Sequence, residues 1–169
     1  MKTIVNVSDI KISDNPYEEL ITYALGSCLG ITVYDPEAVV GGMLHVMMPL
    51  STADPDKAKK NPAMYVDSGF FELLNRVYDY GATKKNLKIY VAGGASMKQS
   101  DSEDYFKIGK RNITVLRKLM WKNGFMIHAQ DVGGVKSRTM LLRMSDGLVT
   151  INKQPMVKER ARRTAVSRP

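Results

Sequence analysis

The sequence predicts an α/β sandwich in which a mixed β-sheet packs with two main helices. Segments rich in β-branched and aromatic residues dominate the first third of the chain and return near its end. Two segments with helical spacing of apolar residues lie between them, and one strand-like segment separates the two. Because this order is not a regular series of βαβ units, we expect a mixed sheet rather than a parallel one.

The N-terminal third is predicted to be rich in β-strands. The turn-forming sequence Asp14-Asn15-Pro16 separates the first two strands, and Asp35-Pro36 and Pro49 end the next two. We expect the third and fourth strands to pair as a hairpin. The four expected strands are residues 3–7, 20–25, 31–34 and 39–48.

Two helices are predicted in the middle of the chain, over residues 63–80 and 108–123. Gly81 and Gly124 follow them directly, and glycine is the residue that most often caps a helix C-terminus. Their apolar stripes consist of Val66, Phe70, Leu73, Leu74 and Val77 in the first helix, and Ile113, Leu116, Leu119 and Met120 in the second.

Three further segments are expected to complete the β-structure. They are residues 87–92, 126–130 and 139–151. The last is interrupted by Asp146-Gly147, a favoured two-residue hairpin turn, so it should form two strands that pair with each other.

Length and charge indicate one globular domain followed by a basic tail. A chain of 169 residues with 44% hydrophobic and 25% charged residues has the size and composition of a single domain. Residues 153–169 hold six basic residues and one acidic residue, so +5 of the net charge of +8 lies there and +3 remains in residues 1–152. We expect a domain over 1–152 and a tail over 153–169 that is either disordered or helical only on a partner.

The same composition argues against several classes of protein. One cysteine excludes an internal disulfide, and the N-terminus lacks the apolar run of a secretion signal or membrane span, so we expect a cytoplasmic protein without membrane insertion. With only His45 and His128 beside that cysteine, no zinc-ligand set of familiar spacing is present, and we expect no catalytic metal. Neither glycine cluster, 93–94 or 133–134, matches a nucleotide-binding motif, so we expect them to shape the floor of a site.

Cys28 is the candidate nucleophile. It lies in Leu25-Gly26-Ser27-Cys28-Leu29-Gly30, where the flanking glycines permit a tight backbone just before a strand. A buried and inert cysteine is the alternative, because free cysteine is among the most buried residue types.

His45 is the candidate base, because a histidine is unusual in a strand of large apolar residues such as 42–48. If its strand pairs with the one after Cys28, the two side chains can meet, and the imidazole can lower the thiol pKa so that thiolate is available at pH 7. A core histidine bonded to a backbone carbonyl is the alternative. Thr22, on the preceding strand, offers a hydroxyl to orient the ring, although most strand threonines reflect β-propensity alone.

Six segments of the chain resemble, in order, the signature of the CheD family of chemoreceptor glutamine deamidases, and the match runs over roughly residues 18 to 150. Ser137-Arg138 departs from it, standing where many members have Gly-Arg, and the tail lies outside it. The six segments are Leu25-Gly26-Ser27-Cys28, Leu44-His45-Val46-Met47-Met48-Pro49, Tyr65-Val66-Asp67, Gly93-Gly94-Ala95-Ser96-Met97, Ile108-Gly109-Lys110-Arg111-Asn112 and Asp131-Val132-Gly133-Gly134.

The resemblance implies a three-layer α/β sandwich and a papain-like triad of Cys28 (nucleophile), His45 (general acid and base) and Thr22 (orienting His45). It implies hydrolysis of glutamine side chains on the cytoplasmic helices of methyl-accepting chemoreceptors through a thioester, without a cofactor, and binding of a CheC-type phosphatase. The backbone N–H of Cys28 is the candidate oxyanion donor.

Two other readings of the sequence stay open. An adaptor that binds and regulates a CheC-type phosphatase, with little deamidase activity, fits the same resemblance. A nucleic-acid-binding domain would use the basic tail and lose affinity steeply with salt, but the aromatic residues are not interleaved with the tail, so we expect no nucleic-acid partner.

Overall fold

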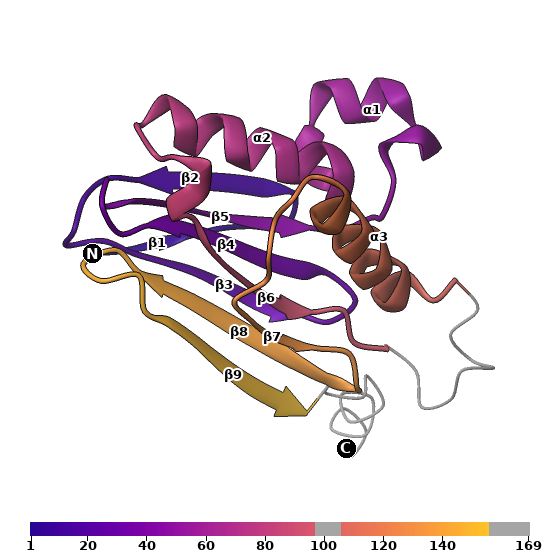
Figure 1. Ribbon diagram of the computed structural model, residues 1–169. Helices are drawn as coiled ribbons and strands as arrows, with labels where there is room; N and C mark the ends of the chain where they lie inside the picture. Colours follow the sequence, from indigo (N-terminus) through magenta and orange to yellow (C-terminus); the bar gives the residue numbers. More distant parts are fainter. Residues whose placement is uncertain (97–105, 156–169) are drawn as a thin grey trace, which may run out of the picture.

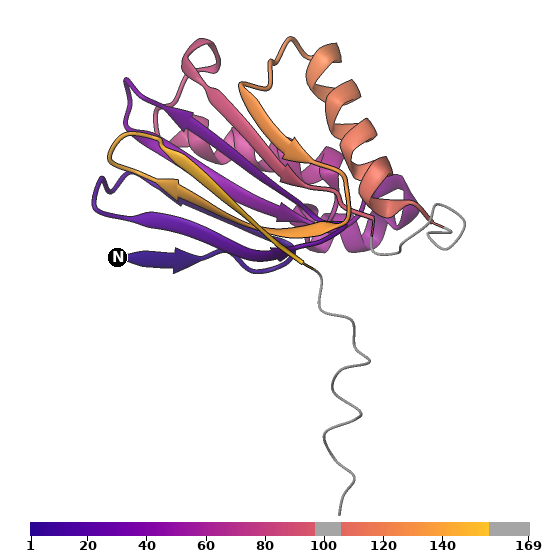
Figure 2. The ribbon, with the colours of Figure 1, turned by 90° about the horizontal axis from the view of Figure 1, so that it is seen from below.

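The computed structural model arranges the chain in three layers, with helices on one face of a five-stranded sheet and a four-stranded sheet on the other (Figures 1 and 2). It describes residues 1–96 and 106–155. The α/β class with mixed strand pairing and two main helices is confirmed. The strands, which the sequence did not divide between sheets, form two.

The five-stranded sheet lies in the middle and contains the predicted hairpin. β4 and β5 pair antiparallel along seven residues, and every residue of both strands is buried. The other ladders are antiparallel except β6 with β7. In spatial order the strands are β2 (Asp9–Ser13), β5 (Val40–Val46), β4 (Leu29–Asp35), β6 (Lys88–Gly93) and β7 (Ala129–Val132).

The four-stranded sheet joins the N-terminus to the C-terminal hairpin. β1 pairs parallel with β3, and the remaining ladders are antiparallel. In spatial order the strands are β1 (Lys2–Ile4), β3 (Glu19–Leu25), β8 (Lys136–Arg143) and β9 (Val149–Pro155). β9 runs three residues past Asn152, so the first residues of the expected tail pair with β8, and residues 156–169 lie outside the described part of the chain.

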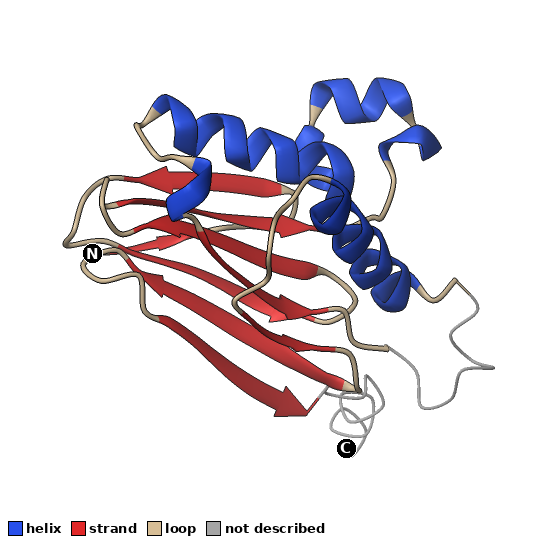
Figure 3. Cartoon of the chain, viewed as in Figure 1, coloured by secondary structure: helices blue, strands red, loops and turns tan. Residues whose placement is uncertain are grey.

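The helices cover the outer face of the five-stranded sheet (Figure 3). α2 (Val66–Asp79) buries the stripe that its sequence predicts, and Gly81 follows it with a φ of +100°. α3 (Ile108–Lys122) lies beside α2 and is followed by Gly124 with a φ of +74°. The shorter pieces are α1 (Pro55–Lys60) and the 3-10 turns η1 (Ser51–Ala53), η2 (Pro62–Met64) and η3 (Lys84–Asn86).

Two apolar cores follow from the three layers, because successive side chains on a strand point to opposite faces. Along β5, Leu44 and Val46 pack in the core under the helices, whereas Met43 packs in the core between the sheets. His45 lies between Leu44 and Val46, so its side chain enters the space between the sheets.

Apart from the 3-10 turns, the elements that were not predicted are β2 and α1. β2 alternates Ile10 and Ile12 with polar residues, whereas the strand expected at 3–7 overlaps β1. α1 buries only Ala58, so it has no apolar stripe; Asp54 caps it by accepting a hydrogen bond from the Lys57 N–H, with Pro55 at its first turn.

Candidate active site

The Cys28 loop, residues 26–28, carries the chain from β3 in one sheet to β4 in the other. Ala24 has a φ of +57°, and the Gly26 N–H donates to the Ala24 carbonyl oxygen at 3.0 Å. The tight backbone expected from the flanking glycines is therefore made at Ala24, a residue type that seldom adopts this conformation. Cys28 is partly exposed and lies immediately before the first residue of β4.

Strand register brings Cys28 and His45 to the same face of the sheet. Gly30 pairs with His45, and a Cβ on Gly30 would lie 2.8 Å from Leu25 Cδ1, so this face looks toward the four-stranded sheet. Cys28 is two residues before Gly30, and its side chain packs against the core between the sheets. Diagonal cross-strand neighbours have Cβ atoms about 7–8 Å apart or somewhat less, within reach of a long side chain.

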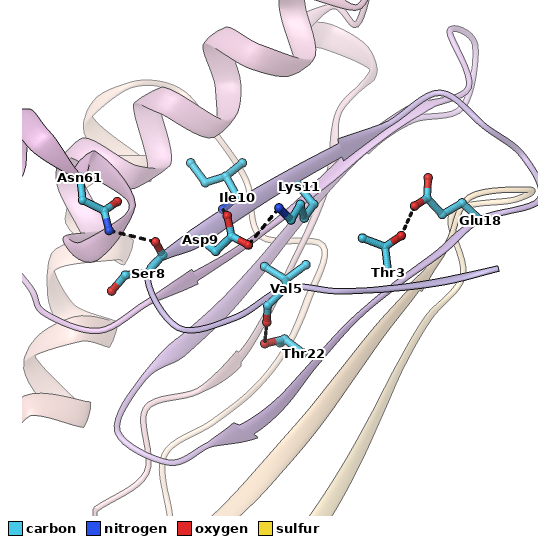
Figure 4. A network of polar contacts seen from close by, with 9 residues as sticks. All are labelled: Thr3, Val5, Ser8, Asp9, Ile10, Lys11, Glu18, Thr22 and Asn61. Atoms are coloured by element: carbon cyan, nitrogen blue, oxygen red, sulfur yellow. Dashed lines mark hydrogen bonds and ion pairs between the residues drawn. The ribbon is translucent and has the colours of Figure 1, made fainter.

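Thr22 contacts His45 directly. Both side chains are buried, and Thr22 Oγ1 lies 2.7 Å from His45 Nδ1. The same hydroxyl donates to the Val5 carbonyl oxygen at 2.7 Å, an interaction visible in Figure 4. Because a hydroxyl has one hydrogen, Thr22 must accept from the Nδ1–H of His45. Neutral His45 is then unprotonated at Nε2, a buried atom without a hydrogen-bond partner among the described residues.

Burial favours the neutral forms of Cys28 and His45. It raises the pKa of the Cys28 thiol, while the residue's own backbone N–H opposes the rise. Burial also lowers the pKa of His45 to about 4. The sequence-based expectation of a thiolate at pH 7 is therefore wrong for the resting site, because desolvation disfavours both charged forms.

The first glycine cluster packs directly against the Cys28 loop. Gly94 N–H donates to the Cys28 carbonyl oxygen at 2.9 Å, and Ala95 N–H donates to that of Gly26 at 2.8 Å. A Cβ on Gly93 would lie 2.2 Å from the Cys28 oxygen, and the φ of Gly93 is +108°. Only glycine suits this position, because both its conformation and its close approach exclude a side chain.

The second glycine cluster is tied to the first. Gly133 N–H donates to the Gly93 carbonyl oxygen at 2.9 Å, and Gly133 in turn accepts from Arg138 Nη1 at 2.6 Å. Arg138 is buried and also bonds Asp131 at 3.1 Å. The exposed hydroxyl of Ser137, the departure from the family pattern, donates to the Gln154 carbonyl oxygen on β9.

Asn112 on α3 ends one of the six family-like segments, but the sequence alone indicated no role for it. Its side chain is fully buried, and Nδ2 donates to the carbonyl oxygens of Ser27 at 2.9 Å and Met47 at 3.2 Å. The available signal was an amide in line with the buried Leu116 and Met120, four and eight residues later on the same helix.

Other candidate groups lie elsewhere. Nδ1 of His128 accepts a hydrogen bond from the Ile89 N–H, far along β6 from Gly93. In the described ranges, no three His, Cys, Asp or Glu side chains gather as metal ligands. No helix in those ranges is both long and apolar enough to cross a membrane.

Comparison with known proteins gives one consistent family. A family model described as CheD chemotactic sensory transduction matches residues 47–153. The probable chemoreceptor glutamine deamidase CheD of Solibacter usitatus is 44% identical over 156 residues, which is 92% of this chain and 91% of that one. Its namesake from Pyrococcus abyssi is 42% identical over 132 residues, covering 78% and 80%.

A solved structure, Neisseria meningitidis protein NMB0706, shares 8% identity with a TM-score of 0.43, covering 79% of this chain and 62% of that one.

Proposed function

The chain belongs to the CheD family, and from that membership we propose that it is a protein-glutamine deamidase, a hydrolase that converts specific glutamines of methyl-accepting chemoreceptors to glutamate and releases ammonia. Its relatives are named for this activity. The observation that carries the proposal is the Thr22–His45 hydrogen bond on the face that also receives the Cys28 side chain.

Cys28 is the nucleophile, His45 the general acid and base, and Thr22 the residue that orients His45. The hydroxyl of Thr22 is committed to the Val5 carbonyl oxygen, so it stabilises the tautomer with hydrogen on Nδ1. Nε2 then has a lone pair for the thiol proton. A triad depends on this arrangement, because a base in the wrong tautomer cannot accept the proton of the nucleophile.

The first half of the reaction starts from two neutral groups. As the sulfur attacks the carboxamide carbon of glutamine, the thiol proton moves to His45 Nε2 and the carbonyl π electrons move to oxygen. The tetrahedral intermediate then collapses, the C–N bond breaks, and the imidazolium returns the proton to the departing nitrogen. Ammonia leaves and a thioester remains on Cys28.

The second half is hydrolysis of that thioester. Neutral His45 accepts a proton from water as the water oxygen attacks the thioester carbon. Collapse breaks the C–S bond, and the proton on Nε2 returns to sulfur. The products are glutamate and the free thiol, so the net reaction consumes one water and uses no cofactor.

Each intermediate carries an oxyanion that needs a donor. The Cys28 backbone N–H is the candidate, because it lies beside its own sulfur and therefore beside the carbon that the sulfur attacks. The loss of one such donor costs about 100- to 1,000-fold in rate in a well-studied protease.

The product carries a negative charge that the substrate lacks. On a receptor helix this charge changes the repulsion between neighbouring side chains and creates a carboxylate that can later be methylated. The cytoplasmic helices of chemoreceptors are thus the proposed substrate, and a CheC-type phosphatase is the proposed regulatory partner.

Peptide mapping by mass spectrometry tests this function. A receptor cytoplasmic fragment is incubated with the wild-type protein and with Cys28→Ala, and glutamines are searched for a mass gain of about one dalton. A gain with wild type alone supports the deamidase. No gain with folded protein, together with binding of a CheC-type phosphatase, favours the adaptor instead.

A further inference from the structure

Asn112 is a buried polar residue that the proposed mechanism does not use. An amide is costly to bury unless its groups are bonded, and the Oδ1 atom of Asn112 has no partner among the described residues. Its neighbours along the buried side of α3 include Leu116 and Met120. A leucine at 112 would avoid the unbonded oxygen but would leave the carbonyl oxygens of Ser27 and Met47 without this donor. The amide is therefore explained by the two carbonyl groups that it holds and not by packing.

We propose that Asn112 is a positioning residue for deamidation, which holds the Ser27–Cys28 peptide so that the Cys28 N–H faces the oxyanion. The inference rests on the proposed function. Asn112 Nδ2 donates to the Ser27 carbonyl oxygen at 2.9 Å. Because a trans peptide is planar, its C=O and N–H point in opposite directions. Fixing the Ser27 oxygen therefore fixes the direction of the Cys28 N–H.

The hydrogen bonds around this peptide isolate the contribution of Asn112. The Gly26 and Cys28 carbonyl oxygens accept from the backbone N–H groups of Ala95 and Gly94. The Ser27 oxygen, between them, accepts from a side chain. A substitution at 112 consequently frees the Ser27–Cys28 peptide while the two flanking bonds stay in place.

The same amide group also reaches the strand that carries the base. Nδ2 donates to the carbonyl oxygen of Met47, two residues after His45. The Met47 N–H is anchored in turn on the Met64 carbonyl oxygen at 3.0 Å. Asn112 therefore links the peptide before the nucleophile to the segment that follows the base.

Gly109 allows the helix to come this close. A Cβ at Gly109 would lie 2.4 Å from the Ala95 carbonyl oxygen and 2.6 Å from that of Gly94. The first turn of α3 thus packs against the same backbone that holds the Cys28 loop, and Asn112 follows less than one turn later.

The first test replaces Asn112 by leucine, a side chain of similar size without donors. The matched control is Asn123→Leu at the other end of α3, where Nδ2 also donates to a backbone carbonyl, that of Leu119 at 2.8 Å. We expect kcat for receptor deamidation to fall about 10- to 100-fold in Asn112→Leu, with KM within about threefold of wild type. Asn123→Leu should keep kcat. A lower melting temperature with kcat within about twofold of wild type would overturn the proposal.

A second measurement needs no receptor, so it separates this proposal from the proposed function. The rate of Cys28 alkylation by iodoacetamide is followed against pH. Because the Cys28 N–H favours the thiolate, freeing the peptide should move the alkylation midpoint of Asn112→Leu upward by about half a pH unit or more. An unchanged midpoint counts against Asn112 positioning this N–H. A wild-type protein that fails to deamidate defeats the proposed function alone.

Asn112→Asp provides a conservative rescue. Its carboxylate faces two carbonyl oxygens without a donor, whereas the protonated acid donates one hydrogen bond. The ratio of variant to wild-type kcat should therefore rise as the pH falls, and the ratio cancels titrations that both proteins share. A ratio independent of pH would assign Asn112 a structural role only.

Discussion

His45 donates its Nδ1–H to Thr22 because the hydroxyl hydrogen of Thr22 is already bound to the Val5 carbonyl oxygen, with 2.7 Å between the atoms of each pair. The N-terminal segment sets the direction of these two hydrogen bonds, because it holds the Val5 carbonyl group in place. Val5 N–H donates to the Ile21 carbonyl oxygen and continues the ladder of β1 with β3. The segment before the site thus determines which nitrogen of His45 is free.

Thr22→Val tests whether these two hydrogen bonds orient His45. Valine keeps the shape but leaves Nδ1–H of His45 and the Val5 carbonyl oxygen without the hydroxyl, so neither tautomer is favoured. We expect kcat for deamidation to fall about 100-fold, because triads that lose their orienting group lose at least that much. Thr22→Ser retains the hydroxyl and should stay within about threefold. Equal kcat values for the two variants, with unchanged melting temperatures, would contradict the orienting role.

The rate should be insensitive to pH around the ordinary pKa of histidine. Burial lowers the pKa of His45 to about 4, so the imidazole is neutral and able to accept the thiol proton throughout pH 5 to 8. We expect kcat/KM for a receptor fragment to vary less than about twofold over pH 5.5 to 7.5. The pH profile of initial rates provides the check. A half-maximal rate near pH 6.5 would mean that His45 is not desolvated in the free enzyme.

Stability should fall with acid because of the same residue. The pKa of His45 is about 4 when folded and about 6.5 when unfolded, so below pH 6.5 the unfolded chain binds more protons. At about 1.4 kcal/mol per unit, the free energy of unfolding should lose about 3 kcal/mol between pH 6.5 and 4 from this group. The loss begins as the pH drops below 6.5 and is complete below 4.

Urea unfolding of wild type and His45→Gln at pH 7 and pH 4.5 measures that effect. Glutamine does not titrate, so the variant should lose less stability on acidification. Carboxylates whose pKa is held low, such as Asp131 beside Arg138 and Lys153, contribute equally to both proteins and cancel. Parallel acid losses in the two proteins would show that His45 is not buried in its neutral form.

Elements with a strong periodic signal could be predicted from the sequence. α2 and α3 agree within three residues at each end because their apolar stripes and following glycines reflect one packed face and one cap. The β4–β5 hairpin could be predicted because Pro36 follows its first strand and Pro49 comes after its second. β2 did carry a local signal, the alternation of Ile10 and Ile12 with polar residues, which was overlooked. The division into two sheets carries no local signal, since it depends on which strands meet in space.

The residues of the candidate site could be proposed from the sequence, but their protonation states could not. The spacing of Cys28 and His45 predicts that the two could meet across paired strands. The register places Gly30, two residues after Cys28, opposite His45, and His45 Nε2 has no hydrogen-bond partner among the described residues. The sequence does not reveal how completely the pair is desolvated, and this decides that both groups rest neutral. Asn112 lies in a family-like segment, but its role was missed because its partners, Ser27 and Met47, are 85 and 65 residues away.

Gly93→Ala should damage the site more than a glycine replacement of equal backbone strain elsewhere. Gly81 and Gly93 have similar φ values, +100° and +108°, so alanine costs each about 1–2 kcal/mol in conformation. A Cβ at 81 meets nothing within 4 Å, whereas at 93 it would lie 2.2 Å from the Cys28 carbonyl oxygen.

We therefore expect Gly81→Ala to lose stability with kcat unchanged. Gly93→Ala should lose more stability and, because the Cys28 loop must move, at least about tenfold in kcat. Thermal melts and deamidation rates measured side by side decide the matter, and equal effects of the two variants would mean that the loop can move without cost to the reaction.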